Sequence, residues 1–281
     1  MIDKNIRTIR AEIERIDTLP TIPTILKKLL GVIENPKASL TTIGNFVSND
    51  PVLTSRVLRM VNSPVYGFPG RISSVNQSLI LLGLNVVRGL LLGVSVFEAM
   101  QKAMLGLWEH SLGAAIAARV IAKRKKMNEP EEVSIAALLH DMGKVALSLK
   151  FPAEYEKLLS DVEARSLLIY EGEKELFEIT HADAGAWVAK RWNFPPNLVE
   201  IIEYHHKPHL SKNYPMQTAV VHLADALIRA RGFGFAGDML VPHLNQAAWY
   251  SLDLKEQDLK DIMLELEDLL QEAAEFILSD E

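Results

Sequence analysis

Two adjacent polar residues, His140 and Asp141, stand in a mostly apolar run, LLHDMGKVAL, at residues 138–147. A buried histidine–aspartate pair is destabilising unless it is hydrogen-bonded, ion-paired or bound to a metal. The chain contains no cysteine, so the ligands of any metal must be histidine, aspartate or glutamate. The pair therefore raises the question of a metal site built from imidazole and carboxylate groups.

Other histidines and one more aspartate fall in apolar settings along the second half of the chain. The complete set of candidate ligands is His110, His140, Asp141, His181, His205, His206 and Asp225. Ligands that converge from several helices commonly form sites for one or two metals, and a carboxylate beside a histidine can bridge two cations. A single histidine on an amphipathic helix is more often a core or surface residue than a ligand, and spacing alone does not decide.

Three histidines stay outside this set. His209 and His243 flank prolines in predicted loops, and we assign no chemistry to them. His222 lies three residues before Asp225 on the same predicted helix, which makes it a candidate for supporting a ligand through a hydrogen bond.

The elements that carry these residues are predicted to be helices throughout, since strand signals are weak and apolar residues recur at three- and four-residue steps. We expect helices near 4–16, 20–35, 39–48, 51–62, 74–97, 104–126, 131–149, 152–165, 173–192, 195–206, 215–231 and 254–278. The predicted fold class is all-α. Between two of these helices, PVYGFPGRISS is the clearest loop, with Asn62 expected as a buried amide that bonds backbone groups and Ser74 as a helix cap.

Composition limits the classes of function. The 281 residues are 48% hydrophobic and 23% charged, which is typical of a folded protein, and the net charge of −6 offers no global field for nucleic acid or anionic membrane. Residues 79–97 are strongly apolar, but Asn85 and Arg88 lie in the middle, so we predict a buried helix. The N-terminus lacks the apolar core of a signal peptide, and a cytoplasmic location is the default expectation.

Longer stretches resemble known families. The segments LPTIPTILKKLL, SLTTIGNFVSNDPVLTSRVLRMVNSPVYG and ISSVNQSLILLGLNVVRGLLL are similar to the HDOD family of bacterial signalling output domains, and the similarity continues to about residue 210. The order H…HD…H…HH…D, with HDMGK at its centre, resembles the HD superfamily of metal-dependent phosphohydrolases. The resemblance implies a two-lobed helical bundle, with an HDOD lobe at 1–100 and an HD-like lobe at 101–281. The HD-like lobe would hold the metal site and end in an amphipathic helix.

The resemblance also assigns roles by position. His110, His140, Asp141 and Asp225 match the ligands of single-metal HD sites, and His181, His205 and His206 match the added ligands of dinuclear members such as the HD-GYP phosphodiesterases. Lys144 matches the lysine that faces the substrate phosphate in active HD enzymes, which makes Lys144 and Asp141 the candidate catalytic residues. A surface lysine is the alternative. The implied cofactor is one or two divalent transition metal ions, with Fe or Mn favoured and Ni, Co or Zn as alternatives.

Two departures restrict the comparison with HD-GYP enzymes. The segment HHKPHLSKNYP replaces the GYP region, so hydrolysis of cyclic di-GMP is not supported. Gly106 stands where some members carry an acidic ligand for a third metal, so we expect at most two ions.

Three functions remain open. The first is a signalling regulator of HDOD type that retains a metal-binding HD site, the second is a metal-dependent phosphohydrolase acting on a nucleotide or phosphoester, and the third is a metal-free interaction module. No receiver, GGDEF or DNA-binding segment is recognisable in the sequence. We therefore expect a signalling partner that binds the N-terminal lobe, a phosphate or nucleotide as ligand, and no direct contact with nucleic acid or membrane.

Overall fold

The computed structural model describes residues 5–16, 40–66, 68 and 71–278, and this part of the chain is helical with no strand. The first helices are α1 (Ile6–Glu14), α3 (Leu40–Ser48), α4 (Pro51–Val61), α5 (Val75–Ala103), α6 (Leu107–Arg124), α7 (Pro130–Leu139) and α8 (Met142–Lys150). They are followed by α9 (Pro152–Arg165), α10 (Ile169–Phe177), α11 (His181–Arg191), α12 (Pro196–Tyr204), the 3₁₀ helix η1 (Pro208–Leu210), α13 (Pro215–Arg231), α14 (Gln246–Leu252) and α15 (Glu256–Leu278). The all-α prediction is confirmed. The segment LPTIPTILKKLL lies outside the described residues.

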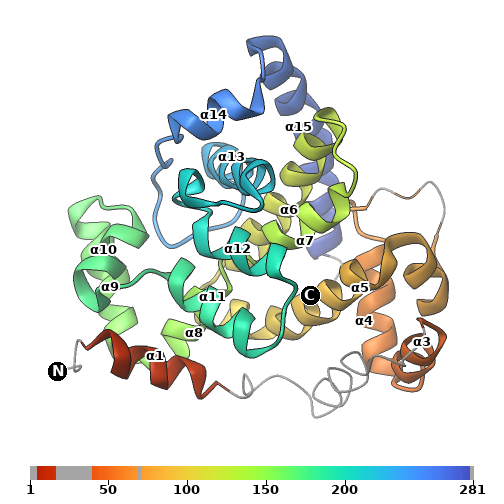
Figure 1. Ribbon diagram of the computed structural model, residues 1–281, viewed down its shortest axis with the longest axis horizontal. Helices are drawn as coiled ribbons and strands as arrows, with labels where there is room; N and C mark the ends of the chain where they lie inside the picture. The colour runs from red at the N-terminus through yellow and green to blue at the C-terminus, as the bar shows by residue number, and fades with distance from the viewer. Residues whose placement is uncertain (1–4, 17–39, 67, 69–70, 279–281) are drawn as a thin grey trace.

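The helices form two groups joined by α5 (Figure 1). Helices α3 and α4 pack on α5 at one end of the molecule, while α5 also contacts α7 and α8 of the larger group. Helix α1, although first in the chain, packs against α8 and α11, where the Trp192 indole donates a hydrogen bond to the Ile16 carbonyl over 3.3 Å. The division into lobes at residue 100 remains a prediction.

Helix α6 is the centre of the larger group and is buried along almost its whole length. It packs against α7, α13 and α15, and its small residues at 113–115, 117 and 118 let these neighbours approach closely. A helix that is apolar on all sides is stable only inside a protein. Because His110 lies on this helix, its imidazole is placed in the core.

Three helices predicted as continuous are interrupted. One is α5, where Gly83 has a φ of +79° and a ψ of 168°, and the other two interruptions lie at candidate ligands. The predicted helix 131–149 breaks into α7 and α8 at His140 and Asp141, and the predicted helix 173–192 breaks before His181. Apolar periodicity continues through both breaks, which is why the sequence pattern did not reveal them. The Thr180 backbone N–H donates to the Asp183 carboxylate over 2.8 Å and begins α11 anew.

The loop between α4 and α5 is tied by Asn62. Its amide nitrogen donates to the carbonyls of Leu58 (2.6 Å) and Ile72 (2.9 Å), and its amide oxygen accepts from the Ile72 N–H (2.8 Å). Ser74 accepts from the Gln77 N–H over 3.1 Å, as expected of a helix cap. The expectation of a buried amide was wrong, because Asn62 is exposed and the loop that it closes lies at the surface.

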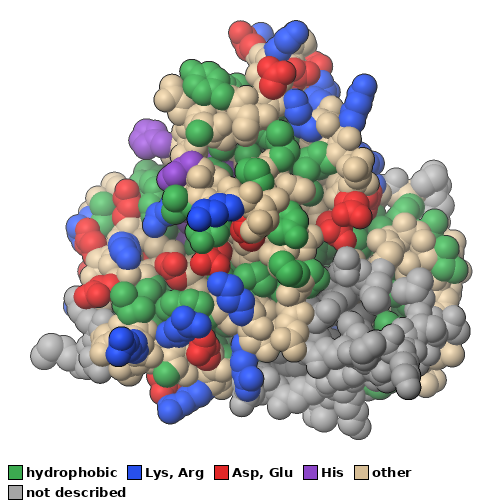
Figure 2. All heavy atoms as spheres, viewed as in Figure 1, with side chains coloured by type: hydrophobic (Ala, Val, Ile, Leu, Met, Phe, Trp, Pro, Cys, Tyr) green, Lys and Arg blue, Asp and Glu red, His purple; other side chains and the backbone are tan. Residues whose placement is uncertain are grey.

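None of the helices in the described part of the chain is long and apolar enough to cross a membrane. The side chains of Asn85 and Arg88 lie outside the description, so their predicted surroundings stay untested. On the face drawn in Figure 2, acidic and basic side chains are interspersed rather than gathered by sign.

Candidate metal centre

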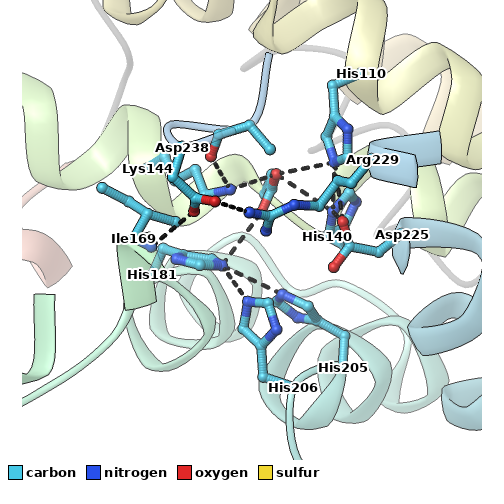
Figure 3. Close-up of polar contacts among 12 residues, drawn as sticks. His110, His140, Lys144, Ile169, His181, His205, His206, Asp225, Arg229 and Asp238 are labelled. Atoms are coloured by element: carbon cyan, nitrogen blue, oxygen red, sulfur yellow. Dashed lines mark hydrogen bonds and ion pairs between the residues drawn. The ribbon is translucent and has the colours of Figure 1, made fainter. Parts of the chain in front are cut away.

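A first group of ligand atoms comes from three helical regions that meet in the core. The Nε2 atom of His110 lies 3.4 Å from Nε2 of His140 and 3.2 Å from Oδ1 of Asp225 (Figure 3). Oδ2 of Asp141 lies 3.3 Å from Nε2 of His140 and 3.5 Å from that of His110. Helix α6, the α7–α8 junction and α13 therefore point four donor atoms at one space.

A second group lies beside the first and shares Asp141 with it. The Nε2 atom of His181 lies 3.3 Å from Nε2 of His205 and 2.9 Å from Nε2 of His206. The other carboxylate oxygen of Asp141, Oδ1, lies 3.2 Å from Nε2 of His181. Asp141 thus directs one oxygen to each group, which is the arrangement of a bridging carboxylate.

The separations between donor atoms match those around a metal ion. Donors bound at about 2.1 Å lie roughly 3.0 Å apart at octahedral angles and roughly 3.4 Å apart at tetrahedral angles. Most distances within the two groups lie between 2.9 and 3.5 Å, and the Nε2 atom of His140 lies 4.0 Å from Oδ1 of Asp225. Both groups are therefore candidates for holding a divalent ion.

Hydrogen bonds at the opposite ring nitrogens fix the direction of the imidazole lone pairs. Nδ1 of His140 contacts the Ala137 carbonyl (2.5 Å), Nδ1 of His205 contacts the Ile202 carbonyl (2.7 Å), and Nδ1 of His181 contacts the Glu173 carboxylate (2.6 Å). Each of these acceptors requires a proton on Nδ1, so a neutral ring has its lone pair on Nε2. These lone pairs point at one another and at carboxylate oxygens, a repulsive arrangement that a cation reverses.

Asp141 also has an oxygen that is suited to binding a cation. Its Oδ1 is buried and has no hydrogen-bond donor within the described residues. Nε2 of His181, 3.2 Å away, can donate to Oδ1 only when the ring is protonated, since a neutral ring carries its proton on Nδ1 toward Glu173. Leaving a buried carboxylate oxygen unpaired costs about 1–3 kcal/mol or more, and a bound metal removes this cost.

The electrostatics of the centre favour the deprotonated forms of several candidate ligands. Burial lowers the pKa of His110 and, together with neighbouring histidines, lowers that of His205 and His206 well below the ordinary value. Burial alone would raise the pKa of Asp141, but His140, Lys144 and His181 hold it well below the usual range. Metal ligands must be neutral imidazoles and ionised carboxylates, which is the state that these shifts favour. His181 is an exception, since burial lowers its pKa but Glu173 and Asp141 raise it above the ordinary value.

Lys144 is part of this centre and is not a surface residue. Its side chain is fully buried, and Nζ donates to Oδ2 of Asp141 over 2.6 Å and to the Ala236 carbonyl over 2.8 Å. A buried ammonium needs such partners. The structure therefore rules out the surface-lysine alternative and places the Lys144 ammonium on the Asp141 carboxylate.

Two supporting residues were missed or left open by sequence reasoning. Glu173 is fully buried and accepts from both Nδ1 and the backbone N–H of His181, while the Tyr155 hydroxyl holds its other oxygen over 2.8 Å. His222 is no ligand, since its Nδ1 donates to the His205 carbonyl (2.8 Å) and its Nε2 accepts from the Asn245 N–H (2.9 Å). His209 and His243 are both exposed; His243 lies in a loop as expected, whereas His209 lies in the 3₁₀ helix η1.

Two glycines explain features of the sequence around the ligands. A Cβ atom on Gly143, in HDMGK, would lie 1.9 Å from the His181 carbonyl oxygen, so only glycine lets α8 approach α11. At Gly106 a Cβ would lie 2.8 Å from that of Phe235. A larger side chain has no room there in this packing, and the expectation of at most two ions stays a prediction.

Comparison with known proteins agrees with this description. The model of the HDOD domain matches residues 19–208. An HDOD domain protein of unknown function from Geobacter sulfurreducens has a solved structure with 27% identity, a TM-score of 0.70 and coverage of 97% of each chain. A protein from Shewanella amazonensis SB2B, provisionally named a phosphohydrolase, has 23% identity, a TM-score of 0.68 and coverage of 95% of this chain and 97% of its own, and it supports the fold alone.

A curated relative, an uncharacterised protein of Treponema pallidum (strain Nichols), is 28% identical over 221 residues. The alignment covers 77% of this chain and 43% of the relative, so the chain spans less than half of that protein. The matched HDOD region contains every candidate ligand except Asp225, which follows it in α13. The match extends over more than half of the sequence, and the chain belongs to the HDOD domain family.

Proposed function

We propose that this chain is a regulatory output protein of bacterial signalling whose HD-like part binds two divalent transition metal ions. The first ion would be held by His110, His140 and Asp225, the second by His181, His205 and His206, with Asp141 between them. The observation that carries the proposal is the convergence of seven imidazole and carboxylate side chains on one space, with one oxygen of Asp141 facing each ligand group. The all-nitrogen and oxygen ligand set suits Fe or Mn, and also Ni, Co or Zn.

Metal analysis of the purified protein tests this proposal. Protein prepared without chelator and reconstituted with Fe, Mn, Ni and Zn in turn should retain up to two equivalents of one of them. The double variant His140→Ala/Asp141→Ala should lose the metal and the thermal stabilisation that metal gives, because a ligand bound only to the native state stabilises that state. His243→Ala, which removes an exposed loop histidine, is the matched control and should keep both.

The absence of metal after all four reconstitutions would contradict the proposal and favour the metal-free interaction module. In either case we expect the signalling partner to bind the N-terminal group of helices. Ile80 and Leu81 on α5 support this expectation, since their side chains are 76% and 51% exposed despite their apolar character.

A second candidate function, metal-dependent phosphohydrolysis, rests on Lys144. Its buried ammonium contacts the bridging carboxylate, where it could counter charge that develops on a phosphoryl group. When bound, two metal ions would supply a hydroxide and polarise the phosphate. If the wild type hydrolyses a nucleotide or phosphoester and Lys144→Met strongly lowers this turnover, the result favours the enzyme. A metal-loaded protein without turnover favours the regulator.

A further inference from the structure

Residues 232–245, which we call the cover segment, connect α13 to α14 and run across the metal centre. The segment packs directly on the start of α6. A Cβ atom on Gly234 would lie 2.2 Å from the backbone nitrogen of His110, and Gly234 has a φ of +71°, so this position requires glycine. The Phe235 N–H donates to the Gly106 carbonyl over 2.9 Å. The cover segment therefore touches the backbone that presents the first ligand.

The cover segment binds both buried cations of the centre. The Ala236 carbonyl accepts from Lys144, and the Asp238 carboxylate forms a buried ion pair with the guanidinium of Arg229. The Leu240 carbonyl also accepts from Nε of Arg229 over 2.9 Å. Figure 3 shows Lys144 and Arg229 extending into the same space beside the ligand groups, with Asp238 at the end of Arg229.

The Asp238 carboxylate is held in place by two backbone N–H groups. Its Oδ2 accepts from the Ile169 N–H at the start of α10 and its Oδ1 from the Leu240 N–H, each over 2.8 Å. One carboxylate thus fastens the cover segment to α10 and to Arg229 of α13. The Arg229 side chain is only 4% exposed, and its direct ion pair is with Asp238, while Asp225 and Asp141 act on it from farther away.

The net charge of the centre indicates which kind of group could replace Asp238 as the partner of Arg229. The buried acidic side chains are Asp141, Glu173, Asp225 and Asp238. With Lys144 and Arg229 opposing them and the histidines neutral, they leave a net charge of −2, which two divalent ions would convert to +2. A dianion restores neutrality, and the dianionic phosphate group has several oxygens that can accept from an ammonium and a guanidinium together.

We propose that Arg229 is a second anion-binding residue of the metal centre and that Asp238 competes for it, so that phosphate binds when the cover segment is released. This inference rests on the proposed metal-binding function and names its ligand class as a phosphate monoester or inorganic phosphate. Lys144 exchanges the Ala236 carbonyl, and Arg229 exchanges Asp238, for phosphate oxygens. The cover segment thereby acts as an internal inhibitor of the site.

Calorimetric titration of the metal-loaded protein with inorganic phosphate tests the competition. Asp238→Asn keeps the size of the side chain but removes the charge that holds Arg229, and it should bind phosphate about tenfold more tightly than the wild type. Arg229→Met should bind about tenfold more weakly, and the double variant should resemble Arg229→Met. The matched control is Arg231→Met, which removes an exposed arginine of the same helix and should leave phosphate affinity unchanged.

Equal phosphate affinity in Asp238→Asn and the wild type would overturn the inference. So would a double variant that binds phosphate more tightly than Arg229→Met, because the effect of Asp238→Asn would then not act through Arg229. Metal content, measured on the same samples, separates this failure from failure of the proposed function, which would show as protein without metal. A measurement on the wild type needs no variant to fold. Saturating phosphate should speed hydrogen exchange about tenfold at the amides of Ile169 and Leu240, which both donate to Asp238, and unchanged exchange would also overturn the inference.

Discussion

Replacement of Glu173 by glutamine examines how the second metal group is oriented. Oε2 of Glu173 lies 2.6 Å from Nδ1 of His181 and 2.7 Å from its backbone nitrogen, and both side chains are fully buried. Glutamine can accept the same two hydrogen bonds through its amide oxygen, with its amide nitrogen turned to the Tyr155 hydroxyl. The substitution therefore removes the charge and preserves the packing.

The size of the effect follows from the lost charge. A hydrogen bond to a charged group contributes about 1.5–3 kcal/mol, and a neutral one about 0.5–1.5 kcal/mol. The backbone bond of His181 is equally weakened with and without metal, so it does not change metal affinity. The ring bond does, because metal binding makes the Nδ1 proton more acidic. We expect a loss of about 1–1.5 kcal/mol, or roughly tenfold in affinity for the second ion.

Competition with a chelator measures this loss. The metal-loaded wild type and Glu173→Gln are dialysed against increasing chelator, and the metal retained per chain is counted by mass spectrometry. Glu173→Gln should release one equivalent at about a tenfold lower free chelator concentration, while the other equivalent is retained as in the wild type. Glu175→Gln is the matched control, since Glu175 lies on the same helix but is exposed and paired with Arg165.

Two results would refute this reasoning. Unchanged metal release in Glu173→Gln would show that the glutamate does not tune His181. Equal weakening of both equivalents would show that the two ligand groups do not act as separate sites. Failure of the variant to fold would be visible in circular dichroism and is not expected, because glutamine preserves the volume of the side chain.

Three further perturbations test other parts of the structure. Lys144→Met should keep the metal but weaken inorganic phosphate binding at least tenfold, and lower any turnover about a hundredfold, as measured by calorimetry and phosphate release; unchanged phosphate affinity would remove Lys144 from the site. Asn62→Ala should lower the free energy of unfolding by about 1–2 kcal/mol in urea denaturation without changing metal content, and loss of metal at unchanged stability would contradict a purely structural role. Partial burial raises the pKa of Glu200, but hydrogen bonds from Asn213, Ser211 and Tyr214 lower it to about 2. In chelator-treated protein the free energy of unfolding of the wild type should exceed that of Glu200→Gln by about 1 kcal/mol after solvent screening. This difference should be complete above pH 4.5 and should be lost as the pH falls through about 2. A difference that is constant with pH would show that the charge of Glu200 is not responsible.

The sequence indicated the candidate ligands because they are polar residues on apolar helices or at helix ends, and the family resemblance added their roles. A histidine such as His110, surrounded along its helix by buried residues, lies inside the protein and needs a partner there. The structure brings all of the predicted ligands together and adds Lys144 to them, although metal binding itself remains a proposal. The helical class was equally predictable, since apolar periodicity reports which face of a helix is buried.

The supporting residues were not predictable in the same way. Glu173 lies in EGEKELFE, where its neighbours are solvent-facing glutamates, and only the break before α11 brings it against His181. The contact between Asp238 and Arg229 joins a loop to helix α13, and the contact of Asp238 with Ile169 joins it to α10; no local pattern encodes such contacts. Breaks at His140 and before His181 also escaped prediction, because tertiary packing interrupts a periodicity that continues in the sequence.

Anomalous diffraction from crystals of the metal-loaded protein, at the absorption edge of the metal that it retains, tests the central claim most directly. We predict two peaks, one among the Nε2 atoms of His110 and His140 and Oδ1 of Asp225, and one among the Nε2 atoms of His181, His205 and His206. Oδ2 of Asp141 should face the first peak and Oδ1 the second. No peak at either group, or a peak that does not involve Asp141, would contradict the account.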